Sequence, residues 1–220
     1  MKVYGIIGAG GFGREVIPLA RNMVESSHFS EEPKEIVFVI EDKYEYNTKF
    51  LNGYRVLKLS EFLGMAGEKF FSIAIGDSVA RERIFGSIPM NEARPFSIFS
   101  PTFILLDNNY IDVGAIFSHF THITSNAKIG KHFHCNIYSY IAHDVVIGDY
   151  VTFGPGVKCN GNVIIEDHVY IGAGAIIKDG TNKSIIIGKG SVIGMGAVVT
   201  KSVAPGSVVV GNPAKPITVD

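Results

Sequence analysis

The fold is decided by residues 129–153, which read IGKHFHCNIYSYIAHDVVIGDYVTF. An apolar residue returns here every six positions, and the same period extends from Leu105 to Pro205. The first apolar series comprises Ile111, Phe117, Ile123, Ile129, Cys135, Ile141, Ile147, Phe153, Cys159, Ile165, Ile171 and Ile177, and it resumes at Ile187, Ile193 and Val199. A second series, four residues after the first, comprises Ala115, Thr121, Ala127, Phe133, Ser139, Val145, Val151, Val157, Val163, Val169 and Ala175. This period predicts a hexapeptide parallel β-helix.

Each hexapeptide is expected to form one short strand and one corner. Its large apolar residue points into a triangular prism, and the glycine that often follows, as in Ile129-Gly130, is expected to relieve the turn. Three hexapeptides make one coil, so residues 18 apart stack at about 4.8 Å, and roughly six coils form a column of about 30 Å. The alternative, an ordinary β-sandwich, would show a period of two and irregularly spaced turns.

The period slips once, between Ile177 and Ile187, where the spacing is ten residues. Residues 178–184 must therefore bulge from a corner by four extra residues. Loops that interrupt a solenoid often project beside its binding face. We expect this loop near a bound ligand, and a plain structural insertion is the alternative.

Composition bounds the class of protein. The chain has 220 residues, of which 46% are hydrophobic, and a formal net charge of −1. No apolar run is long enough to span a membrane, and no basic run suggests binding to nucleic acid or to a membrane surface. Residues 1–8 are too short and glycine-rich for a secretory signal. Cys135 and Cys159 fall on the inward series as free thiols, so we expect a cytoplasmic protein.

The first hundred residues follow a different pattern. Strands are predicted over 3–8, 36–40 and 70–75, helices over 13–24 and 78–87, and a polar loop over 26–33. This alternation predicts a small parallel sheet covered by helices, a half-Rossmann βαβαβ domain. We place the domains at 1–100, an α/β domain, and 101–220, a β-helix domain.

The first predicted strand ends in a glycine motif. Residues 8–13 read GAGGFG and satisfy the G-x-G-x-x-G pattern between a strand and a helix. Glycines there let the backbone approach a diphosphate, toward which the helix directs unpaired N–H groups. A dinucleotide site needs two such halves and there is room for one, so we expect a single nucleotide rather than NAD or FAD.

Three acidic residues follow other predicted strands. Glu41 and Asp42 end the second strand, where a carboxylate can contact a ribose hydroxyl or a base N–H. The alternative is that both are solvated turn residues. Asp77 follows the third strand and is a weaker candidate for the same crevice.

Six histidines lie in the repeat region: His119, His122, His132, His134, His143 and His168. None lies 18 residues from another, and the chain has no Cys-x-x-Cys or His-Glu-x-x-His spacing. We therefore expect no catalytic metal. Most of these histidines are expected to be exposed or to lie between subunits.

His143 differs from the other histidines because of its surroundings. It lies outside the inward series and beside Asp144, with the amide of Asn136 seven residues earlier. A neutral imidazole near pH 7 can accept the proton of an amine or hydroxyl that attacks a carbonyl. Adjacent side chains of a strand point to opposite faces, so Asp144 can orient the ring only if a corner bends the backbone there. A surface histidine with an acidic neighbour is the alternative.

Four segments, in order along the chain, resemble a known family. They are the glycine motif at 8–13, Ala74-Ile75-Gly76-Asp77, Ile141-Ala142-His143-Asp144 and the closing residues 210–216, VGNPAKP. Together they resemble the NeuD/PglD family of bacterial sugar acetyltransferases. The resemblance implies a left-handed β-helix, a homotrimer, acetyl-CoA as donor and a nucleotide-linked amino sugar as acceptor. It also implies that domain 1–100 binds the nucleotide sugar and that domain 101–220 is the catalytic domain that binds acetyl-CoA.

Site residues follow from the resemblance position by position. It implies His143 as general base, Asp144 as its acidic neighbour and Asn136 in the sugar pocket. The nucleotide site would comprise Gly8, Gly10, Gly11 and Gly13, with Glu41 and Asp42 at the base and ribose. Coenzyme A would lie between two subunits along backbone groups that include Gly161, Ala173, Gly174 and Met195. Two positions depart from the family pattern: Thr152 and Phe12 stand where several members have histidine.

The expected activity is acetyl transfer from acetyl-CoA to the amine of a UDP- or dTDP-linked 4-amino-4,6-dideoxy sugar, with His143 as base and no covalent acyl-enzyme. One alternative is an O-acetyltransferase that acts on a sialic acid or another sugar hydroxyl. Another is a structural β-helix module with a degenerate nucleotide pocket. The same base serves an amine or a hydroxyl, so the sequence leaves this choice open.

Overall fold

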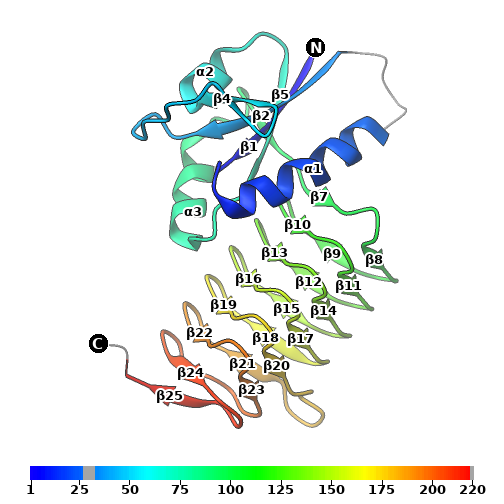
Figure 1. The fold of residues 1–220 in the computed structure, drawn as a ribbon. Helices are drawn as coiled ribbons and strands as arrows, with labels where there is room; N and C mark the ends of the chain where they lie inside the picture. Colours follow the sequence, from blue (N-terminus) through cyan, green and yellow to red (C-terminus); the bar gives the residue numbers. More distant parts are fainter. Residues whose placement is uncertain (27–32, 219–220) are drawn as a thin grey trace. The chain divides into compact units, whose positions relative to one another are not determined.

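The computed structural model describes residues 1–26 and 33–218, and the chain divides into two compact units, Met1–Pro101 and Thr102–Asp220 (Figure 1). Most of the polar loop expected over 26–33, namely residues 27–32, lies outside the described residues. Each unit has its own architecture.

The first unit is an α/β domain with one six-stranded sheet in the order β3-β4-β2-β1-β5-β6. Its strands are β1 (Lys2–Ile7), β2 (Lys34–Ile40), β3 (Phe50–Leu51), β4 (Tyr54–Lys58), β5 (Glu68–Ile73) and β6 (Arg94–Pro95). All neighbouring strands are parallel except β3 and β4. The helices are α1 (Gly11–Ser26), α2 (Leu59–Gly64) and α3 (Ser78–Ser87), and β7 (Ile98–Phe99) packs against α1.

This sheet is larger than the three strands expected from the sequence. β3, β4, β6 and α2 were not predicted, and the predicted third strand, 70–75, begins two residues later than β5. Strands of two to five residues and a six-residue helix are too short for a period to be recognised. A cluster of buried apolar residues forms one core: Val3, Ile7, Val37, Val39, Leu57, Phe62, Phe71, Ile73, Ile84, Ile88 and Ala93.

The second unit is a parallel β-helix with three faces (Figure 1). The first face comprises β10 (Ile116–Phe117), β13 (His134–Cys135), β16 (Thr152–Phe153), β19 (Tyr170–Ile171), β22 (Val192–Ile193), β24 (Val208–Val210) and the antiparallel β25 (Lys215–Ile217). The second face comprises β8 (Ile104–Leu105), β11 (His122–Ile123), β14 (Tyr140–Ile141), β17 (Lys158–Cys159), β20 (Ile176–Ile177) and β23 (Val198–Val199). The third comprises β9 (Tyr110–Ile111), β12 (Lys128–Ile129), β15 (Val146–Ile147), β18 (Val163–Ile165) and β21 (Ile185–Ile187).

The register confirms the predicted stacking. Residues pair with those 18 positions later, as in Ile123 with Ile141, and the offset becomes 22 across the insertion, as in Val163 with Ile185. The four extra residues therefore lie in the loop between β20 and β21 and leave the stacking of the strands intact. The fold class is confirmed: an α/β domain followed by a hexapeptide β-helix.

The two inward series form the solenoid core. Every residue of both series is buried except Ile111, which is partly exposed because β9 ends the third face. Each fully buried isoleucine or phenylalanine contributes about 1.5–3 kcal/mol. Cys135 and Cys159 are buried free cysteines, and burial raises the pKa of both thiols, so both stay protonated.

The backbone at the corners shows that the glycines after the first apolar series do not have the role expected for them. The residue with positive φ stands three positions after the first apolar series, as His132 (φ 51°), Asp144 (φ 59°) and Tyr150 (φ 59°). Glycines directly after the series, such as Gly130, have no positive φ; a Cβ on Gly130 would lie 2.6 Å from the carbonyl carbon of Gly148 in the next coil. These glycines therefore allow close approach between coils rather than relieve the turn.

Candidate active site and nucleotide-binding region

His143 and Asp144 occupy a corner between the second and third faces. The His143 corner comprises residues 142–145 and the equivalent residues 160–162 and 178–184 of the next two coils. The Asp144 amide donates to Ser125 O (3.0 Å), and the His143 carbonyl accepts from Asn162 N (3.0 Å). The left-handed backbone at Asp144 turns the two neighbouring side chains toward each other, so His143 Nδ1 lies 2.9 Å from Asp144 Oδ2.

The Asp144 carboxylate orients the imidazole. The hydrogen bond from His143, and a second from Asn126 Nδ2 to Oδ1 (3.2 Å), lower the pKa of Asp144 below its ordinary value. An ionised carboxylate only accepts hydrogen bonds, so Nδ1 carries the ring hydrogen and Nε2 of the neutral ring is an acceptor. The His143 side chain is 57% exposed, which leaves Nε2 accessible.

Gly161 and Asp179 complete this corner. Gly161 lies 18 residues after His143, and Asp179 lies 18 residues after Gly161, so the three residues stack in one column along the solenoid. A Cβ on Gly161 would lie 2.6 Å from His143 Nε2 and 2.8 Å from Asp179 Oδ2. Only a glycine at position 161 therefore leaves room for the imidazole of His143. His143 Nε2 lies 3.9 Å from Asp179 Oδ2. Asp179 was not among the predicted site residues, although the break in the period marked its loop.

The other predicted solenoid residues lie elsewhere. The Ala173 corner, between the first and second faces, comprises residues 136–139, 154–157, 172–175 and 194–197. It holds Asn136, whose Nδ2 donates to Phe153 O (3.0 Å), and the exposed Ala173, Gly174 and Met195, of which Met195 is 82% exposed. Within one chain, none of these residues lies at the His143 corner.

Two of the remaining histidines are buried within a single chain. His132 is 0% and His134 1% exposed within a single chain, so these two are not exposed residues. His132 stacks on Tyr150 (5.7 Å between ring centroids), which stacks on His168 (5.3 Å), because a six-residue period also aligns the corner residues. Thr152 is buried on β16 of the first face rather than at the His143 corner. Across residues 1–26 and 33–218, no group of three or more metal-ligating side chains is gathered for an ion.

In the α/β unit, the glycine motif forms the turn from β1 into α1. Gly8 has φ +116°, and a Cβ on Gly13 would lie 1.9 Å from Gly8 O. Gly10 and Gly11 face open space, and Gly10 O accepts from Arg14 N (3.1 Å) at the start of α1. Gly8 and Gly13 thus hold the turn closed, while Gly10 and Gly11 keep it accessible.

A cavity of about 320 Å³ lies at the carboxyl ends of the strands. It is lined by Ile7, Gly8, Ala9, Gly10, Val39, Ile40, Glu41, Tyr44, Tyr46 and Ile75. The chain continues from β1 to β2 on one side, while β5 pairs on the other, so the cavity lies at a topological switch point, where α/β sheets bind ligands. Tyr44, Tyr46 and Ile75 were missed from the sequence because they follow no glycine or acidic pattern.

The three acidic candidates differ in their contacts. Glu41 lines the cavity and accepts two hydrogen bonds from Arg83 (2.6 and 2.9 Å), which lower its pKa. Asp42 accepts from Ser60 Oγ (2.5 Å) at the start of α2 and does not line the cavity. Asp77 caps α3 by accepting from Val79 N and Ala80 N (both 2.9 Å). Of the three, only Glu41 lines the cavity.

The Glu41–Arg83 pair predicts a pH-dependent effect of Arg83→Gln. Because Arg83 lowers the pKa of Glu41 below its ordinary value of 4.5, the stabilisation is present above that value and is lost as the pH falls through the folded-state pKa. The variant should unfold at lower urea concentration than the wild type at about pH 7, with the difference shrinking toward about pH 3. A difference that stays constant over this range would contradict the prediction.

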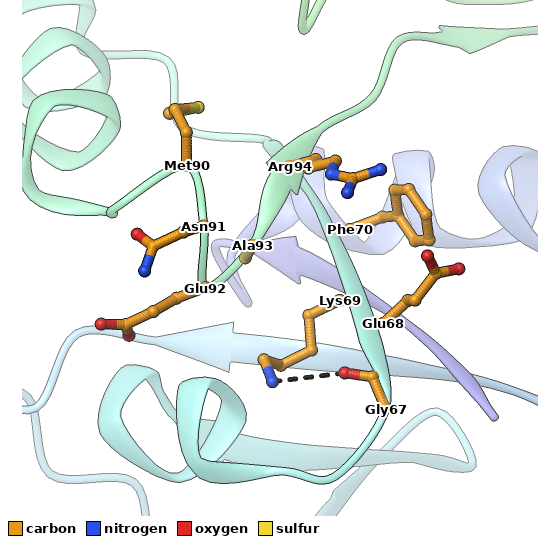
Figure 2. A pocket seen from close by; sticks show the side chains of 9 residues that line it. All are labelled: Gly67, Glu68, Lys69, Phe70, Met90, Asn91, Glu92, Ala93 and Arg94. Carbon is orange, nitrogen blue, oxygen red and sulfur yellow. Dashed lines mark hydrogen bonds between the residues drawn. The ribbon is translucent and has the colours of Figure 1, made fainter.

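A second cavity, of about 310 Å³, lies at the opposite ends of the strands (Figure 2). It is lined by Gly67, Glu68, Lys69, Phe70, Met90, Asn91, Glu92, Ala93 and Arg94. Lys69 turns toward the backbone, where its Nζ lies 3.4 Å from Gly67 O (Figure 2). Open α/β sheets bind ligands at the carboxyl ends of their strands, which favours the first cavity over the second as a ligand site.

The fold and the site define the class of the protein: a hexapeptide-repeat solenoid, joined to an α/β domain, with an imidazole–carboxylate pair at one corner. Within residues 1–26 and 33–218, no helix has the length and apolar character needed to cross a bilayer.

Comparison with known proteins gives the family. The PglD N-terminal domain family matches residues 5–88, and the hexapeptide repeat of succinyl-transferase matches residues 162–201. A relative from Escherichia coli O157:H7, GDP-perosamine N-acetyltransferase, is 47% identical over 98% of this chain and 96% of its own length. The chain belongs to the NeuD/PglD family of sugar acetyltransferases, which confirms the resemblance found in the sequence.

Two solved structures share the fold over nearly the whole chain. WeeI from Acinetobacter baumannii AYE has a TM-score of 0.90 at 48% identity and covers 99% of this chain and 100% of its own. The acetyltransferase domain of PglB from Neisseria gonorrhoeae FA1090, in complex with acetyl coenzyme A, has a TM-score of 0.84 at 24% identity and covers 98% of each chain.

Proposed function

We propose that this protein transfers the acetyl group of acetyl-CoA to the amine of a nucleotide-linked 4-amino-4,6-dideoxy sugar. The observation that carries the proposal is the His143 corner, where Asp144 fixes one ring nitrogen as donor and leaves Nε2 as an accessible base. Membership of a sugar acetyltransferase family supports the same reaction class.

In the proposed mechanism, His143 Nε2 accepts a proton from the amine as nitrogen attacks the thioester carbon. A backbone N–H, for which we propose Gly161, stabilises the oxyanion of the tetrahedral intermediate. The intermediate then collapses, the carbon–sulfur bond breaks, and the imidazolium returns the proton to the leaving thiolate. Because donor and acceptor meet in one site, positioning can supply roughly 7–11 kcal/mol of the barrier.

We propose that the nucleotide binds in the cavity beside Gly8 and Gly10. The diphosphate would lie against the glycine turn and the start of α1. Glu41 would accept from a ribose hydroxyl or a base N–H, since a carboxylate has about four acceptor sites and Arg83 occupies two. Four other residues stay predicted substrate-site residues, although none of them lines this cavity: Gly11, Gly13, Asp42 and Asn136.

For the nucleotide itself we propose guanosine diphosphate. The expectation of UDP or dTDP stays untested, whereas the relative that is 47% identical is named for a GDP-linked sugar. We also propose a cytoplasmic homotrimer, in which coenzyme A lies between two subunits along Gly161, Ala173, Gly174 and Met195.

A thermal scan with separate additions of acetyl-CoA, GDP, UDP and dTDP tests donor and nucleotide together. A ligand at a hundred times its dissociation constant stabilises the folded state by about 2.7 kcal/mol. We expect acetyl-CoA and GDP to raise the melting temperature and UDP and dTDP to raise it less. No shift with acetyl-CoA would favour the structural-module alternative, and a larger shift with UDP or dTDP would overturn the choice of guanosine.

A further inference from the structure

The loop inserted at 178–184 brings a second carboxylate to the His143 corner. Asp179 lies 36 residues after His143, two coils along the same column, at the start of the four-residue excess. Gly180 N donates to Gly161 O (3.0 Å), and Asn162 Nδ2 donates to Gly180 O (2.5 Å), so the start of the loop is tied to the preceding coil. The position of Asp179 is therefore set by the scaffold.

The side chain of Asp179 is also oriented. Thr181 Oγ1 lies 3.0 Å from Asp179 Oδ1, where the hydroxyl donates, and the other oxygen, Oδ2, lies 3.9 Å from His143 Nε2. Two acceptors thus face each other above Gly161, which has no side chain to fill the space between them. The Asp179 side chain is 39% exposed, so a substrate group can reach it.

Two acceptors at this spacing fit one amine nitrogen. A nitrogen about 2.9 Å from each atom would donate one hydrogen to Asp179 and one to His143. A neutral primary amine has two hydrogens, so both acceptors are satisfied and the lone pair remains for the thioester carbon. A hydroxyl has one hydrogen, and one of the two acceptors would stay unpaired, which costs binding energy.

We propose that Asp179 is an acceptor-binding residue that selects an amine over a hydroxyl. The proposal rests on the proposed function and deepens it, because neither the sequence nor the His143–Asp144 pair separates N- from O-acetylation. Asp179 holds one N–H of the acceptor throughout the reaction, while His143 removes the other.

The test compares two acceptors, a GDP-linked 4-amino-4,6-dideoxy sugar and its counterpart with a hydroxyl in place of the amine. In Asp179→Ala, kcat/KM for the amine should fall about 10- to 100-fold, as expected for the loss of a hydrogen bond to a charged group. Inhibition by the hydroxyl counterpart should stay unchanged or strengthen. Asp179→Asn, which keeps the size but replaces one carboxylate oxygen with an amide donor, should show a smaller change in the same direction.

Lys183→Gln is the matched control, since it changes the charge of the same loop by one unit at an exposed side chain. It should leave both acceptors unaffected. Equal losses for amine and hydroxyl in Asp179→Ala, or no change for either, would overturn the proposal. If the wild-type protein acetylates no nucleotide-linked amino sugar, the proposed function fails instead, so the two failures are distinguishable.

Discussion

Replacing His143 by alanine or asparagine should lower kcat by about 10²- to 10⁴-fold, the usual contribution of a general base. The hydrogen bond between His143 Nδ1 and Asp144 leaves Nε2 as the acceptor for the proton of the amine. Neither alanine nor asparagine provides a base at that position. Steady-state acetylation of the amino sugar, with thiol release as the readout, measures the loss.

The same variants should remain folded and bind ligands. His143 is exposed and contributes nothing to the solenoid core, so the oligomeric mass and the thermal shifts with acetyl-CoA and GDP should match the wild type. His122→Asn, a change of the same kind on β11, serves as the control and should retain activity. Full turnover in His143→Ala would remove this residue from the mechanism.

Gly13→Ala should disrupt the nucleotide-binding unit. The new Cβ would lie 1.9 Å from Gly8 O and 2.8 Å from Gly8 C, and both are backbone atoms that can move only if the turn between β1 and α1 shifts. Overpacking of this kind costs about 1–3 kcal/mol, occasionally more. We expect a lower urea midpoint for the α/β unit and loss of the thermal shift with GDP.

Gly11→Ala is the matched control two residues away, because a Cβ there meets no atom within 4 Å. Its urea midpoint should stay near that of the wild type. Equal midpoints for Gly13→Ala and Gly11→Ala would show that the turn relaxes at no cost, and the close approach of Gly13 to Gly8 would then lose its structural importance.

The solenoid was largely predictable because one short period repeats many times. Each inward position, such as Ile141, is supported by equivalent positions one coil before and after, so the register of 18 and the four-residue insertion follow from counting. The role of the glycines was not predictable, because glycine is the residue expected both where coils approach closely and where φ is positive.

The site was predictable only in part. The sequence indicated His143 and Asp144, and it stated the condition for their contact, a bend that the positive φ of Asp144 supplies. Asp179 and Arg83 were missed because each reaches its partner through the fold, across 36 and 42 positions, where no local pattern exists. The separation of Asp42 from the cavity likewise depends on α2, which was too short to predict.

The stacking of coils also decides where the molecule loosens first. Each coil bonds only to its two neighbours, so order is lost from a free end and advances one layer at a time. On the second face, two strands lie before β14, the strand next to His143, and three lie after it. Met195 is nearer an end of the stack, because only the layer of the β24–β25 hairpin lies beyond it. Warming should therefore loosen the Met195 coil while the His143 corner is still ordered.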